Sequence, residues 1–285
     1  MPELIEIVST GVGVSIQDSG RVGWRRFGVP LGGAMDRHSM AVANRLLGNK
    51  EEAPVLEIMH SGVTLRVLAD TWLALAGADL GSSLQPWRAE RVARGTLLSF
   101  TGPRAGLFAY LAVPGGVDSE RWFGSASADA RNGLGHVLQK ASCVRSMAAL
   151  PQFFAHRVAA RVAIAEDRRD FSAAVELRVL RGPQFEFFSE ASQQALVNAT
   201  WKVSVRSDRS GFRLEGPQIQ VPASIVSEPV LPGSFQIPGN GQPIVTMVDG
   251  PTVGGYAKLA VLAEAELDRL AQCAPGTNIS FKWLD

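Results

Sequence analysis

The sequence predicts a mainly β protein in which antiparallel strands close into a barrel or a sandwich. Short apolar runs dominate the first half of the chain, and turn residues separate them at intervals of about eight to twelve positions. Helical patterns are few, which argues against an α/β arrangement. The runs that read as strands are "VLEIM" from Val55, "VTLRVL" from Val63, "TWLALAG" from Thr71, "TLLSF" from Thr96 and "LFAYLAV" from Leu107.

Three short helices interrupt these strands. The first begins after the N-cap Asp36 and ends at Gly48-Asn49, and these are the residue types that favour the two ends of a helix. Its apolar face carries Met40, Ala43, Leu46 and Leu47. A second helix is predicted from about Ser189 to Asn198, and a third from Glu264 to Gln272, where "APG" ends it.

A faint internal repeat suggests two related halves. "FGVPLGG" from Phe27 and "FQIPGNG" from Phe235 share Phe, a β-branched residue, Pro and a final Gly, as if a strand entered a Pro-Gly turn in each half. The charged stretch 152–172 has little strand alternation and is interpreted as a connection or an atypical element near a domain boundary. We therefore expect two domains, at residues 1–165 and 166–285.

Composition excludes several classes of function. The chain has 285 residues and a net charge of +1, so no surplus of one sign points to nucleic acid or to a membrane surface. Its N-terminal residues lack the apolar core of a signal peptide, and its longest apolar run, "AGLFAYLAV", is too short to span a bilayer. Cys143 and Cys273 match no redox or metal spacing. The expectation is a soluble, cytoplasmic protein with free thiols.

Familiar catalytic motifs are missing from the sequence. There is no P-loop, no complete dinucleotide fingerprint and no nucleophile elbow. His38, His60, His136 and His156 have no metal-ligand spacing, so no metal is predicted. Any chemistry would come from carboxylates, Arg, Lys, hydroxyls and backbone N–H groups.

The stretch "SIQDSGRVGWRRFGVPLGGAMDRHS" at 15–39 is the first candidate site. Its glycines allow a close approach of the backbone to a ligand, and Gln17, Asp18 and Arg21 add polar groups. Gly32 and Gly33 precede the N-cap of the first helix, where backbone N–H groups bind anions. The alternative is that the glycines only make tight barrel turns, with Asp18 and Arg21 paired.

Two further polar stretches are candidates. "GVDSERWFGSASADARNGLG" at 116–135 is predicted to be a long exposed loop, either functional or disordered. "VRSDRSGFRLEGP" at 205–217 offers Arg209 and Arg213 as anion ligands, unless its charges merely pair on a sheet face.

The segment 226–260 gathers the largest set of chemically capable residues. These are Glu228, Gln236, Gln242, Asp249, Thr252, Gly254, Gly255, Tyr256 and Lys258. A lysine can lose its charge when buried, whereas an arginine cannot, so Lys258 is a candidate for chemistry as well as binding. In an extended chain Tyr256 and Lys258 leave the same face. We expect Lys258 to bind an anionic group and Asp249 to hold it or act on a water, against the alternative of an ordinary surface lysine.

Several long motifs closely resemble the biotin-dependent carboxyltransferase-like family. They are "QDSGRVGWRRFGVPLGGAMDRHSMAVANRLLGN", "LEI", "LAGADLG", "VPGG", "SDRSGFRLEGP" and "SEPVLPGSFQIPGNGQPI". The resemblance runs from about Ile7 to Phe281. Its members include the C-type component of ATP-dependent 5-oxoprolinase, the Kip-type antagonist, and half of the carboxyltransferase domain of urea carboxylase; older names include allophanate hydrolase subunit 2.

The resemblance implies two cyclophilin-like β-barrel domains and a partner that is either the B-type component of a 5-oxoprolinase or a Kip-inhibitor-like protein. Departures occur where arginines are usual in the family. Ala126 and Ala128 stand in place of Arg and Thr, and Gly250 and Pro251 in place of Arg and Gln. Pro229 replaces a glycine. The lost arginines imply a different substrate or a scaffolding role.

Three functions follow as expectations. The first is a component of 5-oxoprolinase with Asp18, Glu228 or Asp249 as base. Its cations for the substrate carboxylate and phosphate would be Arg21, Arg209, Arg213 and Lys258. ATP would be bound with partner proteins, including the A-type component. The second is a carboxyltransferase half, with biotin on a separate carrier. The third is a regulatory binding module. Activity of this chain alone is not expected.

Overall fold

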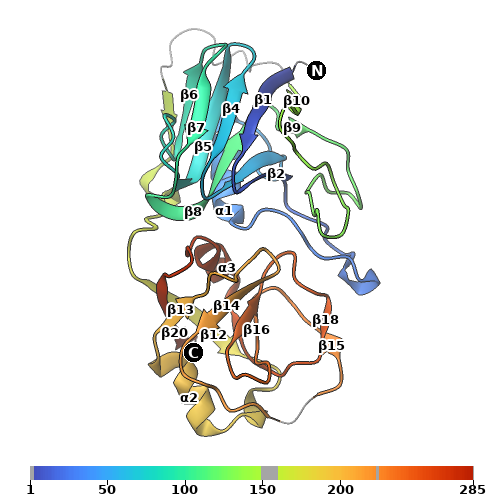
Figure 1. Ribbon diagram of the computed structural model, residues 1–285, viewed down its shortest axis with the longest axis vertical. Coiled ribbons are helices and arrows are strands. Elements are labelled where there is room, and N and C mark those ends of the chain that lie inside the picture. The colour runs from blue at the N-terminus through green and yellow to red at the C-terminus, as the bar shows by residue number, and fades with distance from the viewer. Residues whose placement is uncertain (1–2, 149–159, 223–224, 285) are drawn as a thin grey trace. The chain divides into compact units, whose positions relative to one another are not determined.

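The computed structural model of the chain describes residues 3–148, 160–222 and 225–284 (Figure 1). Its backbone divides into two compact units. The first comprises Met1–Arg21 with Gly32–Ser172, and the second comprises Val22–Leu31 with Ala173–Asp285. The boundary expected after residue 165 lies inside the first unit. Asp167 explains the difference, because its carboxylate pairs with Arg45 at 2.7 Å and its carbonyl oxygen lies 2.7 Å from His38 Nε2.

The first unit consists of two antiparallel sheets. One has the order β7-β4-β1-β10-β9 and the other has the order β11-β6-β5-β8-β3-β2. Their apolar faces meet in a single core cluster of buried side chains. The strands are β1 Glu3–Thr10, β2 Gly13–Gln17, β3 Val55–Met59, β4 Val63–Val67, β5 Thr71–Asp79, β6 Arg88–Val92, β7 Leu97–Phe100, β8 Ala105–Ala112, β9 Val117–Asp118, β10 Cys143–Ser146 and β11 Ala160–Val162.

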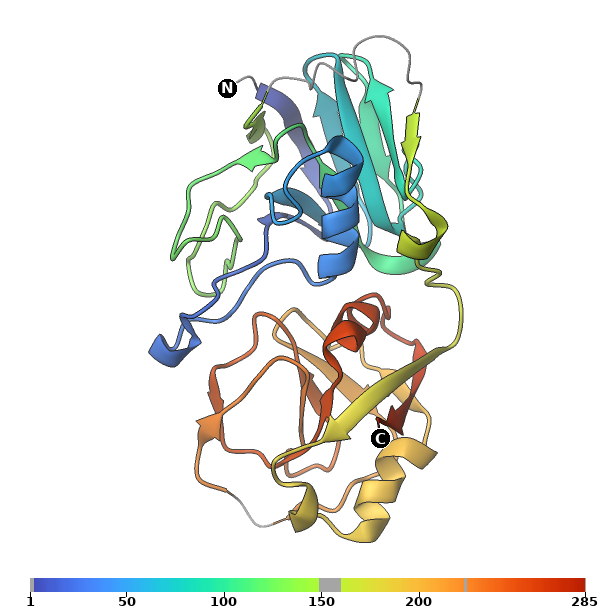
Figure 2. The ribbon, with the colours of Figure 1, turned by 180° about the vertical axis from the view of Figure 1, so that it is seen from behind.

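The burial pattern of strand β5 is explained by the helix that packs on it. Eight of its nine residues are buried, whereas β4 alternates between buried and more exposed positions. The difference arises because helix α1, Arg37–Leu47, packs against β5 and β8 on the outer face of their sheet. Figure 2 shows this helix in blue, lying across the sheet. A strand covered on both faces reads as a continuous apolar run.

The predicted ends of the helices are confirmed. Asp36 caps α1 by accepting a hydrogen bond from the Ser39 N–H at 2.9 Å, and Gly48 ends it with a φ of 72°. Helices α2, Glu190–Asn198, and α3, Glu264–Ala271, lie where the sequence placed them. In the described part of the chain, short 3-10 turns lie at η1 Arg25–Phe27, η3 Ala165–Asp167 and η4 Phe185–Phe187.

The second unit is a closed barrel with the strand order β12-β19-β16-β17-β14-β13-β20. Closure gives each barrel strand a partner on both sides. Trp201 is fully buried in the core, and its indole N–H donates to the Leu196 carbonyl at 2.9 Å. The strands are β12 Val175–Arg181, β13 Trp201–Val203, β14 Gly211–Glu215, β16 Ser234–Gln236, β17 Ile244–Thr246, β19 Lys258–Leu262 and β20 Asn278–Trp283, with a separate pair β15 Glu228–Pro229 and β18 Val253–Gly254.

The prediction of a mainly β fold with a few short helices is confirmed, although the faint repeat behind the two halves is not. Phe27 is 63% exposed in η1, whereas Phe235 is fully buried in β16. The first of these motifs therefore does not enter a sheet. Its residues 27–31 belong to the second unit and its last two glycines to the first. In the second unit the neighbouring Arg25 guanidinium donates to the carbonyl oxygens of Val230 and Pro251.

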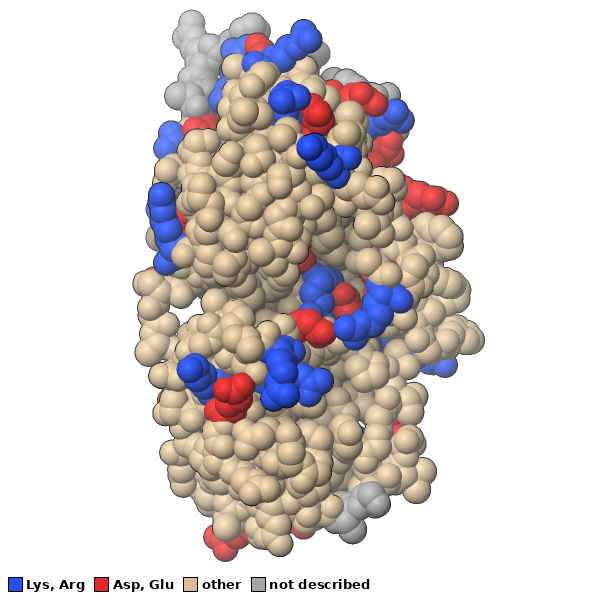
Figure 3. Space-filling view, viewed as in Figure 1, with Lys and Arg blue, Asp and Glu red and all other residues tan. Residues whose placement is uncertain are grey.

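Charge is mixed on the surface. On the face drawn in Figure 3, Lys and Arg side chains lie beside Asp and Glu side chains in most places where charge gathers. This mixture agrees with the net charge of +1. Among the described residues, no helix has the length and apolar character needed to cross a bilayer.

Candidate functional site

Asp18 follows β2 and is an anchor for the loop 125–127. Its carboxylate is buried. One oxygen, Oδ1, accepts from Gly20 N at 2.9 Å, Ser125 Oγ at 2.5 Å and Ser127 Oγ at 2.6 Å. The other oxygen, Oδ2, accepts from Ala126 N at 2.7 Å. Because both oxygens are occupied by fixed donors, this carboxylate holds two distant segments together rather than serving as a base.

Gln17 and Arg21, predicted as ligand-binding residues, reach the same loop. The Gln17 amide donates to the Ala128 carbonyl at 3.0 Å, and the Arg21 guanidinium donates to the Ser127 carbonyl. Both side chains are fully buried. A Cβ on Gly32 would lie 2.5 Å from Arg21 Nη1, so this glycine leaves room for the guanidinium.

The donors expected at the start of α1 are used inside the protein. Ala34 N donates to the Asp18 carbonyl at 2.9 Å, and Met35 N donates to Glu57 Oε2 at 2.8 Å. Asp36 N donates to the Tyr110 hydroxyl at 2.7 Å. These three N–H groups, which lie between the glycines and the helix, are therefore not available to an anion. Gly33 is also structural, since a Cβ there would lie 2.9 Å from the Asp18 carbonyl oxygen.

Glu57 and Tyr110 form a buried polar pair that sequence reasoning missed. The Tyr110 hydroxyl donates to Glu57 Oε2 at 2.9 Å. Burial first, and the nearby carboxylates of Glu57 and Asp36 next, raise the pKa of Tyr110 well above its usual value. A charged residue in the apolar run "VLEIM" was the available signal, because a carboxylate is buried only when hydrogen-bonded.

The loop 116–135 is more ordered than predicted. Its central residues, from Ser125 to Asp129, are buried, because the Asp18 carboxylate and the Gln17 amide hold them. Ala126 lies in the core cluster with no exposed surface. The expectation of a fully exposed loop is therefore wrong for this central part and correct for the residues around Arg131.

The barrel unit places Lys258 beside Glu228. The ammonium Nζ lies 2.6 Å from Glu228 Oε1, and the lysine is only 2% exposed although the side chain of Glu228 is 38% exposed. Gln184 completes the cluster, donating from Nε2 to Glu228 Oε1 at 2.8 Å and accepting from Lys258 N at 3.1 Å. The hydrogen bond from Lys258 first, and that from Gln184 next, lower the pKa of Glu228.

Asp249 is not the partner of Lys258. It forms a two-point ion pair with Arg209, in which Nε lies 2.7 Å from Oδ2 and Nη2 lies 3.1 Å from Oδ1. The sequence placed Asp249 nearer to Lys258, but Glu228 reaches the lysine through the pairing of β15 with β18. The predicted orienting role of Asp249 therefore falls to Glu228 and Gln184.

Tyr256 and Lys258 do not share a face. Tyr256 is 50% exposed, whereas Lys258 is buried. Strand β19 begins at Lys258, and Tyr256 lies in a bend before the strand, so the regular alternation of the strand does not extend back to Tyr256.

The remaining predicted residues have separate surroundings. Arg213 is exposed on β14, and Gln242 forms two hydrogen bonds with the backbone of Gly216, at 2.9 and 3.0 Å. Thr252 accepts from Val230 N at 3.0 Å through its carbonyl. Gly254 pairs with Glu228 across the β15–β18 ladder, and a Cβ on Gly255 would meet Ser227 Oγ at 3.3 Å. Of the predicted set, Lys258 is thus brought to Glu228, which pairs with Gly254, and Arg209 is brought to Asp249.

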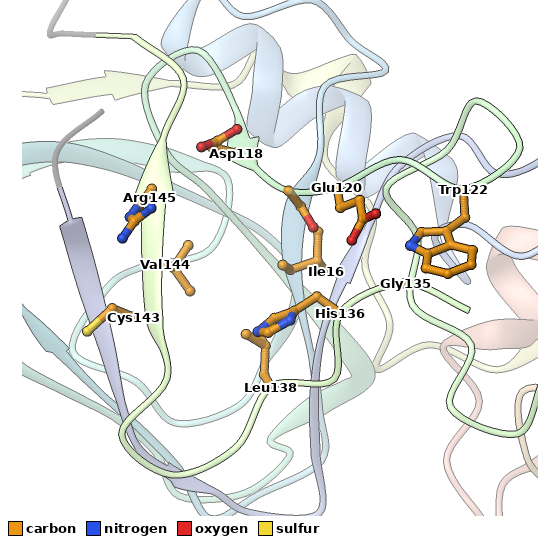
Figure 4. Close-up of a pocket in the computed structure, with 11 residues that line it drawn as sticks. Ile16, Asp118, Glu120, Trp122, Gly135, His136, Leu138, Cys143, Val144 and Arg145 are labelled. Carbon is orange, nitrogen blue, oxygen red and sulfur yellow. The ribbon is translucent and has the colours of Figure 1, made fainter. Parts of the chain in front are cut away.

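The first unit contains a cavity of about 300 Å³ (Figure 4). It is formed by the end of β2, by β9 and β10, and by the loop between them. Its lining residues are Ile16, Asp118, Ser119, Glu120, Trp122, Gly135, His136, Leu138, Cys143, Val144 and Arg145. Sequence reasoning marked this loop but not the individual side chains.

The two cysteines are expected to differ in reactivity. Cys143 is exposed, and desolvation first and Glu3 next raise its pKa, so it should react slowly near neutral pH. Cys273 is buried, and burial raises its pKa to about 12. Thiol counting with an aromatic disulfide should give one slow thiol in the native protein and a second only after denaturation. Rapid modification of both thiols under native conditions would contradict this.

Taken together, the fold and the site describe a mainly β protein of two units, with a Lys–Glu pair at the barrel unit. Residues 27–283 match the family described as "Carboxyltransferase domain, subdomain A and B". The chain belongs to this family, which confirms the resemblance found in its motifs.

Relatives in the family carry different names. The chain is 34% identical to the C component of 5-oxoprolinase from Escherichia coli (strain K12), over 98% of this chain and 90% of that protein. It is 30% identical to the urea amidolyase of Saccharomyces cerevisiae, over 98% of this chain and 16% of that protein.

Solved structures show the same fold. The crystal structure of TTHA0988 matches with a TM-score of 0.89 and 32% identity, over 98% of this chain. The K. lactis urea amidolyase matches with a TM-score of 0.90 and 30% identity, over 100% of this chain. The chain spans 56% of the first of these proteins and 19% of the second.

Proposed function

We propose that this chain is the C-type component of a cytoplasmic, ATP-dependent 5-oxoprolinase and that it works with B-type and A-type partner proteins. The observation that carries the proposal is its similarity to the C components of two 5-oxoprolinases. The chain is 34% identical to the component from Escherichia coli and covers 90% of it. It is 32% identical to the component from Haemophilus influenzae and covers 91% of it.

The Lys258–Glu228 pair offers groups that this chemistry needs. A lactam is stabilised by resonance, and phosphorylation of its oxygen supplies the leaving group that hydrolysis lacks. A lysine ammonium can bind the substrate carboxylate or a phosphate. Glu228, whose lowered pKa keeps it ionised at neutral pH, can accept a proton from water once the ammonium contacts the substrate. Gln184 would keep the Glu228 carboxylate in position beside the Lys258 backbone.

Reconstitution tests the proposal. The chain would be co-expressed with its A-type and B-type partners, and glutamate and ADP measured with and without 5-oxoproline. We expect 5-oxoproline-dependent ATP hydrolysis from the full set and none when this chain is omitted. Full activity without it, or no activity from the full set, would refute the proposal.

Replacing Lys258 by Met in the complex should lower activity by at least about tenfold, because the substitution removes the charge and keeps most of the volume. The same change at Lys50, an exposed lysine after α1, is the control and should leave activity unchanged. Assembly would be checked by size-exclusion chromatography. Wild-type activity in an assembled Lys258→Met complex would exclude this lysine from the chemistry.

A second candidate function is carboxyl transfer, with biotin on a separate carrier. It is favoured by the family description and by the urea amidolyase relatives. Its test is carboxylation of a biotinylated carrier protein followed by loss of the carboxyl group on addition of this chain and an acceptor such as urea. A complex that assembles but is inactive in both assays would favour a regulatory role.

A further inference from the structure

The cavity between β2, β9 and β10 has the features of a binding site for a charged small molecule. We propose that it binds an organic cation, with an ammonium or guanidinium group on a short apolar body. The proposal concerns the first unit and is independent of the Lys258–Glu228 pair.

Two carboxylates give the cavity its charge. Asp118 and Glu120 both line it, and within the described residues neither side chain forms a hydrogen bond or an ion pair. Arg145, which pairs with Asp118 across β9 and β10, instead directs its guanidinium to Glu3 at 3.2 Å. The two lining acids therefore outweigh Arg145, which also lines the cavity, and favour a positively charged ligand.

Two further polar groups line the cavity. The Ser119 hydroxyl oxygen is shielded from solvent and has no hydrogen-bond partner in the described structure. The imidazole of His136, on the opposite part of the loop, likewise makes no hydrogen bond to the described residues. Buried polar groups are usually satisfied, so a shielded hydroxyl at a cavity indicates that a ligand or water completes it.

The cavity also has an apolar lining. Ile16, Leu138 and Val144 are buried beneath it, whereas the Trp122 indole is 41% exposed at its side. Glu120 and Trp122 both line the cavity, and Figure 4 labels them in the same part of the view. The face of an aromatic ring attracts a cation through its ring electrons, as a carboxylate does through its charge. The volume of about 300 Å³ lies at the lower end for ligand pockets and suits a body of roughly ten heavy atoms.

The cavity wall is fixed by the fold. Trp122 and Ser125 exchange backbone hydrogen bonds of 2.8 and 3.2 Å around a tight turn in which Phe123 and Gly124 have φ values of 54° and 82°. Ser125 is in turn held by Asp18 at 2.5 Å. Gly135 packs so closely that a Cβ would lie 2.7 Å from the Ser127 carbonyl oxygen. A wall already in place lowers the entropy cost of binding.

Two other ligand classes fit less well. Among the described residues, no three His, Cys, Asp or Glu side chains are arranged to hold a metal ion, which favours an organic cation. The raised pKa of Cys143 leaves little thiolate at neutral pH, which argues against covalent capture.

The test compares three ligands of similar shape by ligand-observed NMR and isothermal titration on the full chain. Phenethylamine carries the positive charge, 2-phenylethanol is neutral and 3-phenylpropionate is negative. We expect the amine to bind at least about fivefold more tightly than the alcohol, and the carboxylate more weakly than either. Equal binding of amine and alcohol, tighter binding of the carboxylate, or no binding of the amine at 10 mM would overturn the proposal.

Three substitutions locate the binding. Glu120→Gln and Asp118→Asn should each weaken amine binding by at least about threefold, and Trp122→Leu should weaken it similarly. Glu190→Gln, which removes an exposed carboxylate from α2 in the other unit, is the control. Thermal unfolding of each variant shows that it is folded. Unchanged affinity in folded Glu120→Gln and Asp118→Asn would place the amine elsewhere and refute the assignment.

Discussion

Replacing Asp18 by asparagine is expected to lower the free energy of unfolding of the first unit by at least about 3 kcal/mol. The carboxylate accepts from two serine hydroxyls and from two backbone N–H groups. An asparagine amide nitrogen cannot accept, so at least one buried donor loses its partner and two N–H groups face each other. Unfolding becomes easier because these donors stay buried without a hydrogen bond, and no water reaches the buried loop to supply one.

The measurement is thermal or urea unfolding combined with hydrogen exchange at 125–129. Exchange matters because two units need not unfold in one step. Faster exchange confined to these residues would show that the anchor itself has been lost. Glu52→Gln, at an exposed position after α1, is the control and should change the free energy by less than about 0.5 kcal/mol. Wild-type stability and exchange in Asp18→Asn would show that the anchor is unimportant.

Gly250→Ala is expected to destabilise the barrel unit by about 1–3 kcal/mol. A Cβ at this position would lie 2.7 Å from the Ser210 carbonyl oxygen and 2.9 Å from that of Met247, and closer still to Thr246 Cγ2. Thr246 is fully buried, so it has no free space into which to move. The family arginine expected here would therefore require a different local backbone.

Gly239→Ala is the matched control for this experiment. It lies in the same unit, and a Cβ there would meet nothing within 4 Å. Neither glycine has a positive φ, so the backbone cost of alanine is comparable at the two sites. Chemical unfolding of both variants separates packing from backbone effects. Equal stabilities for the two variants would show that the crowding around Gly250 is relieved at no cost.

Local features of the fold were predictable from the sequence. The cap at Asp36 and the stop at Gly48 act within a few residues, and the apolar runs record which strand faces are covered. These signals lie within one element and need no partner to be interpreted. The prediction from the faint repeat failed because it rested on residue types alone. Residue type does not distinguish the exposed Phe27 from the buried Phe235.

The site was predictable only in part, because its contacts join residues distant in the sequence. Asp18 was found, but its partners Ser125 and Ser127 lie more than a hundred positions away. Lys258 was found, but Gln184 is 74 positions from it. A bend at Tyr256, just before β19 begins, also placed this residue apart from the lysine. Residue chemistry was therefore easier to predict than residue pairing.

Residues 22–31 belong to the second unit, so neither unit is made from one continuous stretch of the chain. The chain leaves the first unit after Arg21, returns at Gly32 and leaves again after Ser172. A fragment starting at Ala173 would lack Arg25, whose guanidinium serves the carbonyls of Val230 and Pro251. Exchange of one half between relatives by a single crossover would replace these carbonyls without replacing the arginine that contacts them. Recombination that preserves both halves must therefore transfer two separate stretches of the chain together.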